Sequence, residues 1–309
     1  MIKRAYAALA AMICLLFATG SYADQPRPWE TGMQQAATGN MHQIRWFEAY
    51  TLWFIIPITL LVLILLLVVM VKFRASKNPV PSKTSHNTLI EVIWTLGPVI
   101  VLLFLAVPSF QLLTRQLAPT EEPELTIKAT GYQWNWGYEH QVGESPLAIF
   151  SILQGSGTSP LAFDSFMLKE PDRAAAGKED KSKYPRLLAV DNEMVVPVGK
   201  NVRVLVTAAP TDVIHSFAMP AFGVRIDAIP GRLNETWFNA DREGLYYGQC
   251  SELCGKDHSF MPIAIRVVSD DQYKQWLAAA ATDLNKANKA LMAAVDQPTT
   301  VKVAENTAK

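Results

Sequence analysis

The sequence predicts a membrane protein in which a hairpin of two spanning helices precedes an all-β domain of the sandwich or barrel type. Three observations support this fold class. Two long apolar segments near the N-terminus are separated by a basic loop. Beyond them, short runs of β-branched and aromatic residues alternate with Pro, Gly, Asn and Asp, which is the pattern of many short strands. Half of the 309 residues are apolar, more than one ordinary soluble domain needs.

The N-terminus has the pattern of an export signal. Lys3 and Arg4 precede an apolar run from Ala5 to Thr19, and the small residues of Ser21-Tyr22-Ala23 follow. We expect residues 1–23 to be a cleaved signal peptide. The alternative is a first membrane helix, but the run is shorter than the ~20 residues that span a bilayer. Removal of the signal leaves two cysteines on the oxidising side of the membrane.

A polar periplasmic segment, residues 24–45, is expected to lead into the membrane hairpin, residues 46–119. The first span, Leu52 to Val71, contains no charged residue. The loop after it, Lys72 to Asn87, carries four basic and no acidic residues, which places it in the cytoplasm. A second span is predicted from about Leu89 to Leu113. Both outer ends of the hairpin then lie on the periplasmic side, in agreement with the export signal.

The all-β domain is expected over residues 120–269, with an exposed insertion at about 143–183. Its predicted strands are Leu125 to Tyr138, Arg186 to Val190, Met194 to Val198, Val202 to Ala208, Thr236 to Asn239, Gly244 to Gln249 and Pro262 to Val268. Ser269-Asp-Asp-Gln272 is a capping-box pattern, and it predicts one Ala-rich helix from Asp270 to about Val295. The remainder of the C-terminal segment 270–309 is polar and is predicted to be disordered.

The stretch Cys250-Ser-Glu-Leu-Cys254-Gly-Lys-Asp-His258-Ser-Phe-Met261 lies between two predicted strands. Soft sulfur and imidazole are the ligands that copper prefers, and His215 upstream could complete the set. Two thiolates this close can bridge two metal ions, so we predict a two-copper electron-transfer centre. A structural disulfide is an alternative, but it does not explain the nearby histidine and methionine. Zinc is another, but it has little use for methionine.

The charges exclude one class of function. The chain has 28 basic and 28 acidic residues and no long run of like charge. Proteins that bind nucleic acids usually carry a basic excess, so we expect no nucleic-acid partner.

Four motifs together resemble subunit II of the bacterial haem–copper cytochrome c oxidases. They are the metal stretch 250–261, Asp227-Ala-Ile-Pro-Gly-Arg232, Gly131-Tyr-Gln-Trp-Asn-Trp136 and Glu91-Val-Ile-Trp94. The resemblance covers nearly the whole chain. It implies a two-helix membrane hairpin carrying a cupredoxin-like Greek-key β-barrel, in the bacterial inner membrane with the copper domain in the periplasm.

The resemblance also implies a role for each metal-site residue. Cys250 and Cys254 would bridge both coppers, and His215 and His258 would each complete one of them. Met261 would be a weak ligand to one ion and the backbone carbonyl of Glu252 a ligand to the other. The Glu252 side chain would point toward a magnesium ion shared with subunit I.

Further residues match the family's electron and proton paths. Trp134 corresponds to the residue through which electrons enter, although by itself it could be a core or interface aromatic. Asn135 stands where the family usually has an aromatic, which questions a similar role for that neighbour. Glu91 matches the entrance of a proton-uptake path, although a carboxylate at a helix start is also ordinary. Glu139, Asp164 and Asp212 match acids that face cytochrome c, although each could be a solvated surface charge.

The function implied is that of a respiratory terminal oxidase subunit. Cytochrome c would deliver electrons to the copper centre, and subunit I would reduce oxygen to water and pump protons, with subunit III as a further partner. The chain lacks a C-x-x-C-H motif, so no haem of its own is expected. A quinol-oxidising relative would lack the copper ligands, and nitrous oxide reductase would need a large extra domain. A membrane-anchored copper delivery or storage protein is the alternative from another class.

Overall fold

The computed structural model describes residues 24–80, 82–117, 119, 122–140 and 161–295. The chain divides into two compact units, a helical unit formed by residues 39–120 and a β-rich unit formed by the residues on either side of it. The predicted signal peptide 1–23, the part of the predicted insertion up to residue 160 and the predicted disordered tail 296–309 lie outside the described residues.

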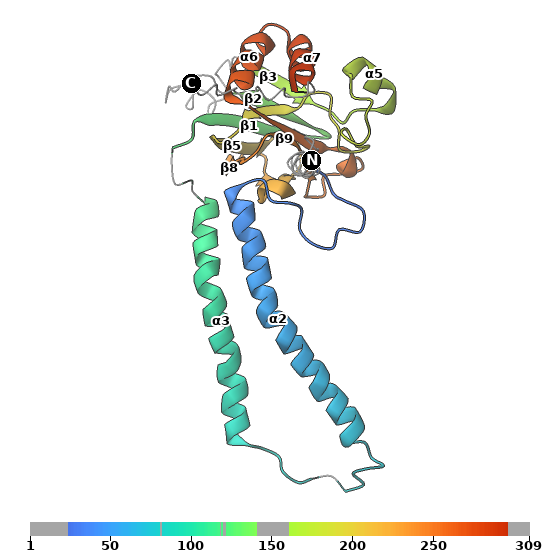
Figure 1. Ribbon diagram of the computed structural model, residues 1–309, viewed down its shortest axis with the longest axis vertical. Helices are drawn as coiled ribbons and strands as arrows, with labels where there is room; N and C mark the ends of the chain where they lie inside the picture. The colour runs from blue at the N-terminus through green and yellow to red at the C-terminus, as the bar shows by residue number, and fades with distance from the viewer. Residues whose placement is uncertain (1–23, 81, 118, 120–121, 141–160, 296–309) are drawn as a thin grey trace, which may run out of the picture. The chain divides into compact units, whose positions relative to one another are not determined.

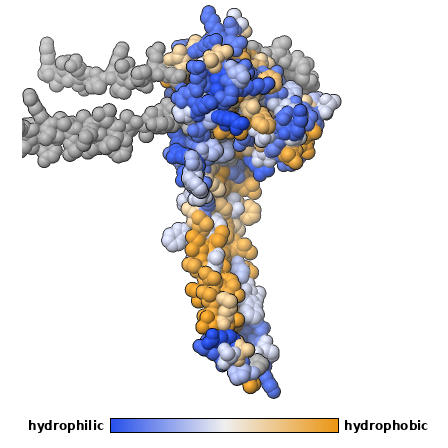
Figure 2. Space-filling model, turned by 90° about the vertical axis from the view of Figure 1, so that its right-hand side faces the viewer, coloured by the Kyte–Doolittle hydropathy of each residue, from blue (hydrophilic) through white to orange (hydrophobic). Residues whose placement is uncertain are grey.

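The helical unit is an antiparallel pair, α2 (Gly39–Lys72) and α3 (Thr88–Leu117) (Figure 1). Both helices are long and apolar enough to cross a membrane, and their outer surface is dominated by hydrophobic side chains (Figure 2). Tyr50 donates a hydrogen bond to the Phe104 carbonyl across the pair, 3.1 Å between heavy atoms. The structure confirms a long apolar helix over each of the two predicted spans. The hairpin was predicted to begin at residue 46. Helix α2 instead begins at Gly39, so the last residues of the predicted polar segment 24–45 are its first two turns.

The β-rich unit contains two five-stranded sheets. The first has the order β3 (Leu161–Ser165), β2 (Asn135–His140), β1 (Leu125–Tyr132), β5 (Asn201–Ala208), β8 (Asn234–Asn239). The second has the order β4 (Met194–Pro197), β10 (Pro262–Val268), β9 (Gly244–Cys250), β6 (His215–Met219), β7 (Val224–Ala228). The pairs β1–β5 and β4–β10 are parallel, and the other neighbours are antiparallel.

The core lies between the two sheets. Trp136 of the first sheet meets Phe217 of the second edge-on, with ring centroids 5.4 Å apart. Phe222, from the short helix η2 (Pro220–Phe222), lies between Phe238 and Tyr246 at 4.7 and 4.9 Å. All five rings are buried. Two sheets packed face to face over interdigitated side chains form a sandwich, so the predicted all-β architecture is confirmed.

The N-terminal segment 24–38 belongs to this unit and lies along the second sheet. Ala37 exchanges backbone hydrogen bonds with Ala221 and Asp241, at 2.9 and 3.0 Å. Asp24 pairs with Tyr246 of β9, and its carboxylate lies 3.3 Å from Arg242. This segment therefore covers part of the β9 edge that β6 leaves open.

Several strand predictions need correction. The run Leu125 to Tyr138 is a hairpin, because Gln133 and Trp134 form a turn between β1 and β2. Arg186 to Val190 is no strand, apart from one bridge between Val190 and Met167. The sequence prediction missed β3, β6 and β7, each of which is only five residues long.

The described residues 161–183 are largely exposed, as predicted, but they are an integral part of the sandwich and not a mere insertion. Strand β3 completes the first sheet, and η1 (Glu170–Asp172) and α5 (Arg173–Ala176) follow it. Lys178 is buried and lies 3.0 Å from Glu193, which also pairs with buried Arg266. Burial alone would raise the pKa of Glu193, but the two cations lower it to about 2. Because an unpaired buried charge is costly, this three-residue ion cluster ties the segment to β10.

The C-terminal segment forms two helices instead of one, α6 (Asp270–Ala280) and α7 (Leu284–Val295). The predicted capping box at Ser269 and Gln272 is present. Asp283 accepts a hydrogen bond from the Lys286 amide at 3.0 Å and so starts a second helix. Tyr273 and Trp276 of α6 pack against His140 of β2, which fixes this helix beside the first sheet.

Candidate metal centre

The predicted metal ligands come from two neighbouring strands and one loop. His215 is the first residue of β6, and Cys250 is the last residue of β9. The loop 251–261 contains the short helix η3 (His258–Phe260) and leads into β10. Its base is closed by a hydrogen bond from the Cys250 amide to the Met261 carbonyl, 3.1 Å. Ser251 donates to the Ser216 carbonyl at 3.0 Å, so sheet pairing fixes both ends of the site.

Sulfur and nitrogen donors converge at this point. The Sγ atoms of Cys250 and Cys254 lie 3.9 Å apart. His215 Nδ1 lies 3.9 Å from the Cys250 sulfur, and His258 Nδ1 lies 3.5 Å from the Cys254 sulfur. The Glu252 carbonyl oxygen is 3.3 Å from the Cys250 sulfur. Each thiol thus has its own imidazole, and the two halves of the site have similar donors.

The site is buried. His215 is 0% exposed, and Cys254 and Met261 are each 1% exposed. Burial, reinforced by the neighbouring Cys250, raises the pKa of Cys254 to about 12, so the Cys254 thiol resists ionisation in the absence of a cation. Burial also lowers the pKa of His215, against the opposite effect of Asp212, which leaves a neutral imidazole. Metal binding requires thiolate and neutral imidazole, and a bound cation would supply the charge that makes two adjacent thiolates favourable.

The geometry also tests the alternatives. Both cysteines are free thiols, and their sulfurs are well beyond the ~2.05 Å of a disulfide bond. Within the described ranges, His215, Cys250 and Cys254 form a group whose ligand atoms all lie within 4.8 Å of one another. Thiolate and thioether sulfurs are soft donors, and imidazole is a common copper ligand. Two thiols, two imidazoles and the buried Met261 therefore suit copper better than zinc. The residues present therefore fit a copper centre.

Trp134 lies against the loop that carries Cys254. It is in the turn between β1 and β2, and its indole Nε1 donates a hydrogen bond to the Cys254 carbonyl at 3.2 Å. The side-chain amide of Gln133 donates to the same carbonyl at 2.8 Å. The Gln133 backbone amide in turn donates to Asp212 at 2.9 Å, and the other carboxylate oxygen of Asp212 lies 3.5 Å from His215 Nε2. The turn is thus connected to both sides of the site.

Two glycines allow this close approach. A Cβ atom on Gly131 would lie 2.9 Å from the His215 ring, and one on Gly255 would lie 3.0 Å from the Trp134 ring. Gly255 also has φ of +124°, which residues with a Cβ rarely adopt. The tip of the β1–β2 hairpin therefore packs directly onto His215 and onto the loop segment that contains Cys254.

Gly131→Ala is expected to disturb the centre from the side of His215. The added methyl group has to displace the buried imidazole, and overpacking of this kind costs about 1–3 kcal/mol. Chemical denaturation of the metal-free chain would measure the loss of stability. Titration with copper would show whether the displaced His215 lowers the affinity for the metal. Gly32→Ala, where an added Cβ meets nothing within 4 Å, is the matched control. Equal stability and equal copper binding in the two variants would contradict the packing argument.

The predicted docking acids have different surroundings. Glu139 pairs with Lys128 at 2.8 Å, and it lines a shallow hollow together with Tyr132 and Asp164. Burial, followed by the charges of Asp164 and Glu139, raises the pKa of Tyr132. Asp212 is different because its side chain is only 13% exposed and is bonded to the hairpin turn.

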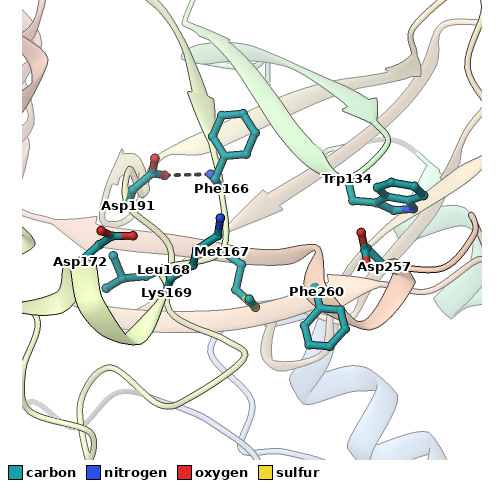
Figure 3. A pocket seen from close by; sticks show the side chains of 9 residues that line it. All are labelled: Trp134, Phe166, Met167, Leu168, Lys169, Asp172, Asp191, Asp257 and Phe260. Carbon is teal, nitrogen blue, oxygen red and sulfur yellow. Dashed lines mark hydrogen bonds between the residues drawn. The ribbon is translucent and has the colours of Figure 1, made fainter.

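A pocket of about 650 Å³ opens beside Trp134 (Figure 3). The metal loop contributes Asp257 and Phe260 to one end, and the segment after β3 forms the other. Its lining combines apolar side chains with three carboxylates and one cation; the charged residues are Asp172, Asp191, Asp257 and Lys169. Burial raises the pKa of Asp191, which accepts a hydrogen bond from the Phe166 amide. Carboxylates thus outnumber cations among the residues that line this pocket.

Comparison with known proteins agrees with these observations. The family model for the periplasmic domain of cytochrome c oxidase subunit II matches residues 125–268, and the model for its transmembrane domain matches residues 26–112. The "Probable cytochrome c oxidase subunit 2" of Rickettsia bellii is 44% identical over 265 residues, 86% of this chain and 89% of that relative. The chain belongs to the cytochrome c oxidase subunit II family.

One further relative and one solved structure are also similar to the chain. Cytochrome c oxidase subunit 2 of Oenothera berteroana is 43% identical over 265 residues, which cover 86% of this chain and 95% of that relative. The solved periplasmic domain of subunit II of the cytochrome oxidase of Bradyrhizobium japonicum is 54% identical, covering 52% of this chain and 95% of that domain, with a TM-score of 0.41. Membership of the subunit II family implies a copper centre and association with other oxidase subunits.

Glu91 belongs to the other unit of this subunit II. It lies in the first turn of α3, and its carboxylate accepts a hydrogen bond from the Asn87 amide at 3.3 Å. This contact is that of a helix-start carboxylate. The proton-path role expected from the resemblance stays a prediction.

Sequence reasoning singled out Trp134 but gave no role to Gln133 or to Gly131. Both stand in the Gly131-Tyr-Gln-Trp motif, so the motif itself was the available signal. Their contacts are with Cys254 and His215, far away in sequence, which is why local pattern alone assigned them nothing. It also described Asp212 as a docking acid, whereas its contacts connect the hairpin turn to His215.

Proposed function

We propose that this chain is the electron-accepting subunit of a respiratory cytochrome c oxidase. In this role a reduced cytochrome c loses one electron, the chain takes it up, and subunit I receives it for the reduction of oxygen to water coupled to proton pumping. No bond is formed or broken on this chain. The observation that carries the proposal is the pair of buried free thiols, each with its own imidazole, joined to Trp134 through the Cys254 carbonyl.

The copper pair would be held by six residues. Cys250 and Cys254 would hold both ions through their thiolates, and His215 and His258 would each supply an imidazole nitrogen to one of them. Met261 and the Glu252 carbonyl would complete the set of ligands. Bound copper would supply one-electron redox chemistry, with the electron shared between two equivalent ions. The chain shields one side of the site from water, since His215, Cys254 and Met261 are almost fully buried, whereas His258 is half-buried and lies nearer the surface. A rigid site lowers the cost of changing the charge.

The acidic surface beside Trp134 suits a basic donor protein such as cytochrome c. Opposite charges steer association and orient the partner. Glu139 and Asp164 would contribute to this surface together with Asp172, Asp191 and Asp257 of the neighbouring pocket. Asp212 would act mainly on the site itself, because its carboxylate already accepts hydrogen bonds from two backbone amides.

The remaining partners follow from the family. The exposed Glu252 side chain would share a magnesium ion with subunit I, and subunit III would complete the assembly. Helices α2 and α3 would span the bacterial inner membrane twice, with the basic loop in the cytoplasm and the copper domain in the periplasm. Glu91 would then lie near the cytoplasmic surface, where protons are taken up.

Copper stoichiometry and electron paramagnetic resonance of the full chain in detergent test the proposal. We expect two coppers per chain and a spectrum with hyperfine coupling to two equivalent copper nuclei. That result requires an unpaired electron shared by both ions. A single copper, or a silent Cu(I) ion that exchanges freely with chelators, would contradict the proposal and would indicate copper delivery instead.

A further inference from the structure

We propose that Gln133 is a positioning residue for electron uptake, which holds Trp134 and the Cys254 segment in fixed contact. This inference rests on the proposed function and adds a residue that the sequence motifs left without a role. It follows from the contacts on the two sides of the β1–β2 turn.

Gln133 makes two hydrogen bonds that point in different directions. Its side-chain amide donates to the Cys254 carbonyl at 2.8 Å, and its backbone amide donates to Asp212 at 2.9 Å. Asp212 lies 3.5 Å from His215 Nε2. Gln133 therefore links the cysteine side of the site to the histidine side, and Trp134 is the next residue in the chain.

The Cys254 carbonyl is shared. It accepts one hydrogen bond from Gln133 and a longer one, 3.2 Å, from the Trp134 indole. A carbonyl oxygen has two lone pairs, so both bonds can form at once. The shorter Gln133 bond fixes the position of the carbonyl, and the indole meets an acceptor that is already in place.

Gly255 gives independent support for this arrangement. A Cβ atom there would lie 3.1 Å from the Gln133 amide nitrogen and 3.0 Å from the Trp134 ring. The side chains of Gln133 and Trp134 thus lie so close to this segment that only glycine fits there. Two residues of the turn pack against two residues of the metal loop, Cys254 and Gly255.

The other contact of the indole is weaker. Lys256 Nζ lies 5.5 Å from the Trp134 ring centroid, but its side chain is 78% exposed. Cation–π contacts at exposed sites are weak, because water screens the charge. The Gln133 hydrogen bond is therefore the stronger restraint on this part of the site.

Two variants of Gln133 separate positioning from docking. Gln133→Met keeps the length of the side chain but cannot donate a hydrogen bond, and Gln133→Glu adds a negative charge that attracts a basic donor. We expect both variants to slow electron uptake within the preformed complex with cytochrome c by about 10- to 100-fold, the scale of effect caused by misplacing a reacting group by ~1 Å. The KM for cytochrome c should stay unchanged in the Met variant and fall in the Glu variant.

The test uses the assembled oxidase, with flash reduction of bound cytochrome c to measure uptake and steady-state turnover to measure KM. Copper content and the electron paramagnetic resonance spectrum should match those of the parent protein. Amide hydrogen exchange of residues 131–136 in the metal-free chain should rise in the Met variant, because the turn loses its attachment.

The outcomes distinguish the two proposals. An intact two-copper spectrum with an unchanged uptake rate would overturn the role of Gln133 alone. Faster uptake in the Glu variant would also overturn it, since that result indicates a docking residue. If the parent oxidase lacks the two-copper spectrum, the proposed function itself fails.

Discussion

Cys254→Ser is expected to abolish the two-copper state and with it electron uptake. Cys254 lies 3.9 Å from the Cys250 sulfur and 3.5 Å from His258, so its loss removes a bridge and isolates one histidine. A serine hydroxyl is a hard donor that ionises far less readily than a thiol and does not replace a bridging thiolate. Losing an outer-shell partner already lowers metal affinity by about 10- to 100-fold, and losing a bridging ligand should cost more.

Copper analysis and electron paramagnetic resonance of the purified variant measure this effect. The spectrum should change from coupling to two equivalent nuclei to coupling to one, or disappear. Ser259→Ala, at an exposed residue of the same loop, is the control and should leave the spectrum unchanged. Retention of two delocalised coppers by Cys254→Ser would refute the bridging assignment.

Trp134→Ala should leave copper binding intact and slow electron uptake on the order of 100-fold. The indole is bonded to the carbonyl of a proposed ligand residue at 3.2 Å and lines the acidic pocket, so its removal opens a gap between donor and acceptor. Displacing a reacting group by ~1 Å can already cost about 100-fold. Trp134→Phe keeps a ring but lacks the N–H donor, and it should fall between the parent protein and the alanine variant.

Flash-induced electron uptake from cytochrome c, measured beside copper content, tests this expectation. Trp29→Ala is the matched control, because Trp29 is 98% exposed and lies in the segment before α2. An unchanged uptake rate in Trp134→Ala would remove Trp134 from the electron path. A loss of copper would instead show that the indole has a structural role at the site.

The sequence was sufficient where the deciding information is local. The membrane spans follow from long runs without charges, and the Ser269 capping box follows from one four-residue pattern. The sulfur and imidazole ligands of the loop lie within twelve residues of one another, so their spacing alone indicates a copper site. The sandwich was predictable as a class because Pro, Gly, Asn and Asp separate many short apolar runs.

The rest depends on contacts between residues far apart in the chain. Strand β3 is stable because β2 offers it an edge, and its five residues alone carry little strand signal. Lys178 looks like part of an exposed charged loop until Glu193 is found beside it. The break between α6 and α7 contains neither Gly nor Pro and is set by Asp283. Gln133 acquires its role only because the Cys254 carbonyl, in the loop between β9 and β10, comes within 2.8 Å of its side-chain amide.

The hairpin contact with the metal loop also determines the order in which the protein matures. In the unfolded chain, Cys250, Cys254, His258 and Met261 are close together, but His215 and the Gly131–Trp134 turn are not. They arrive only when β6 has paired with β9 and the two sheets have closed on each other. Long-range pairings of this kind form late and slowly, so the complete ligand set exists only once the sandwich has formed. We therefore expect copper to bind a domain that is already assembled, and the bound metal to stabilise the last contacts to form.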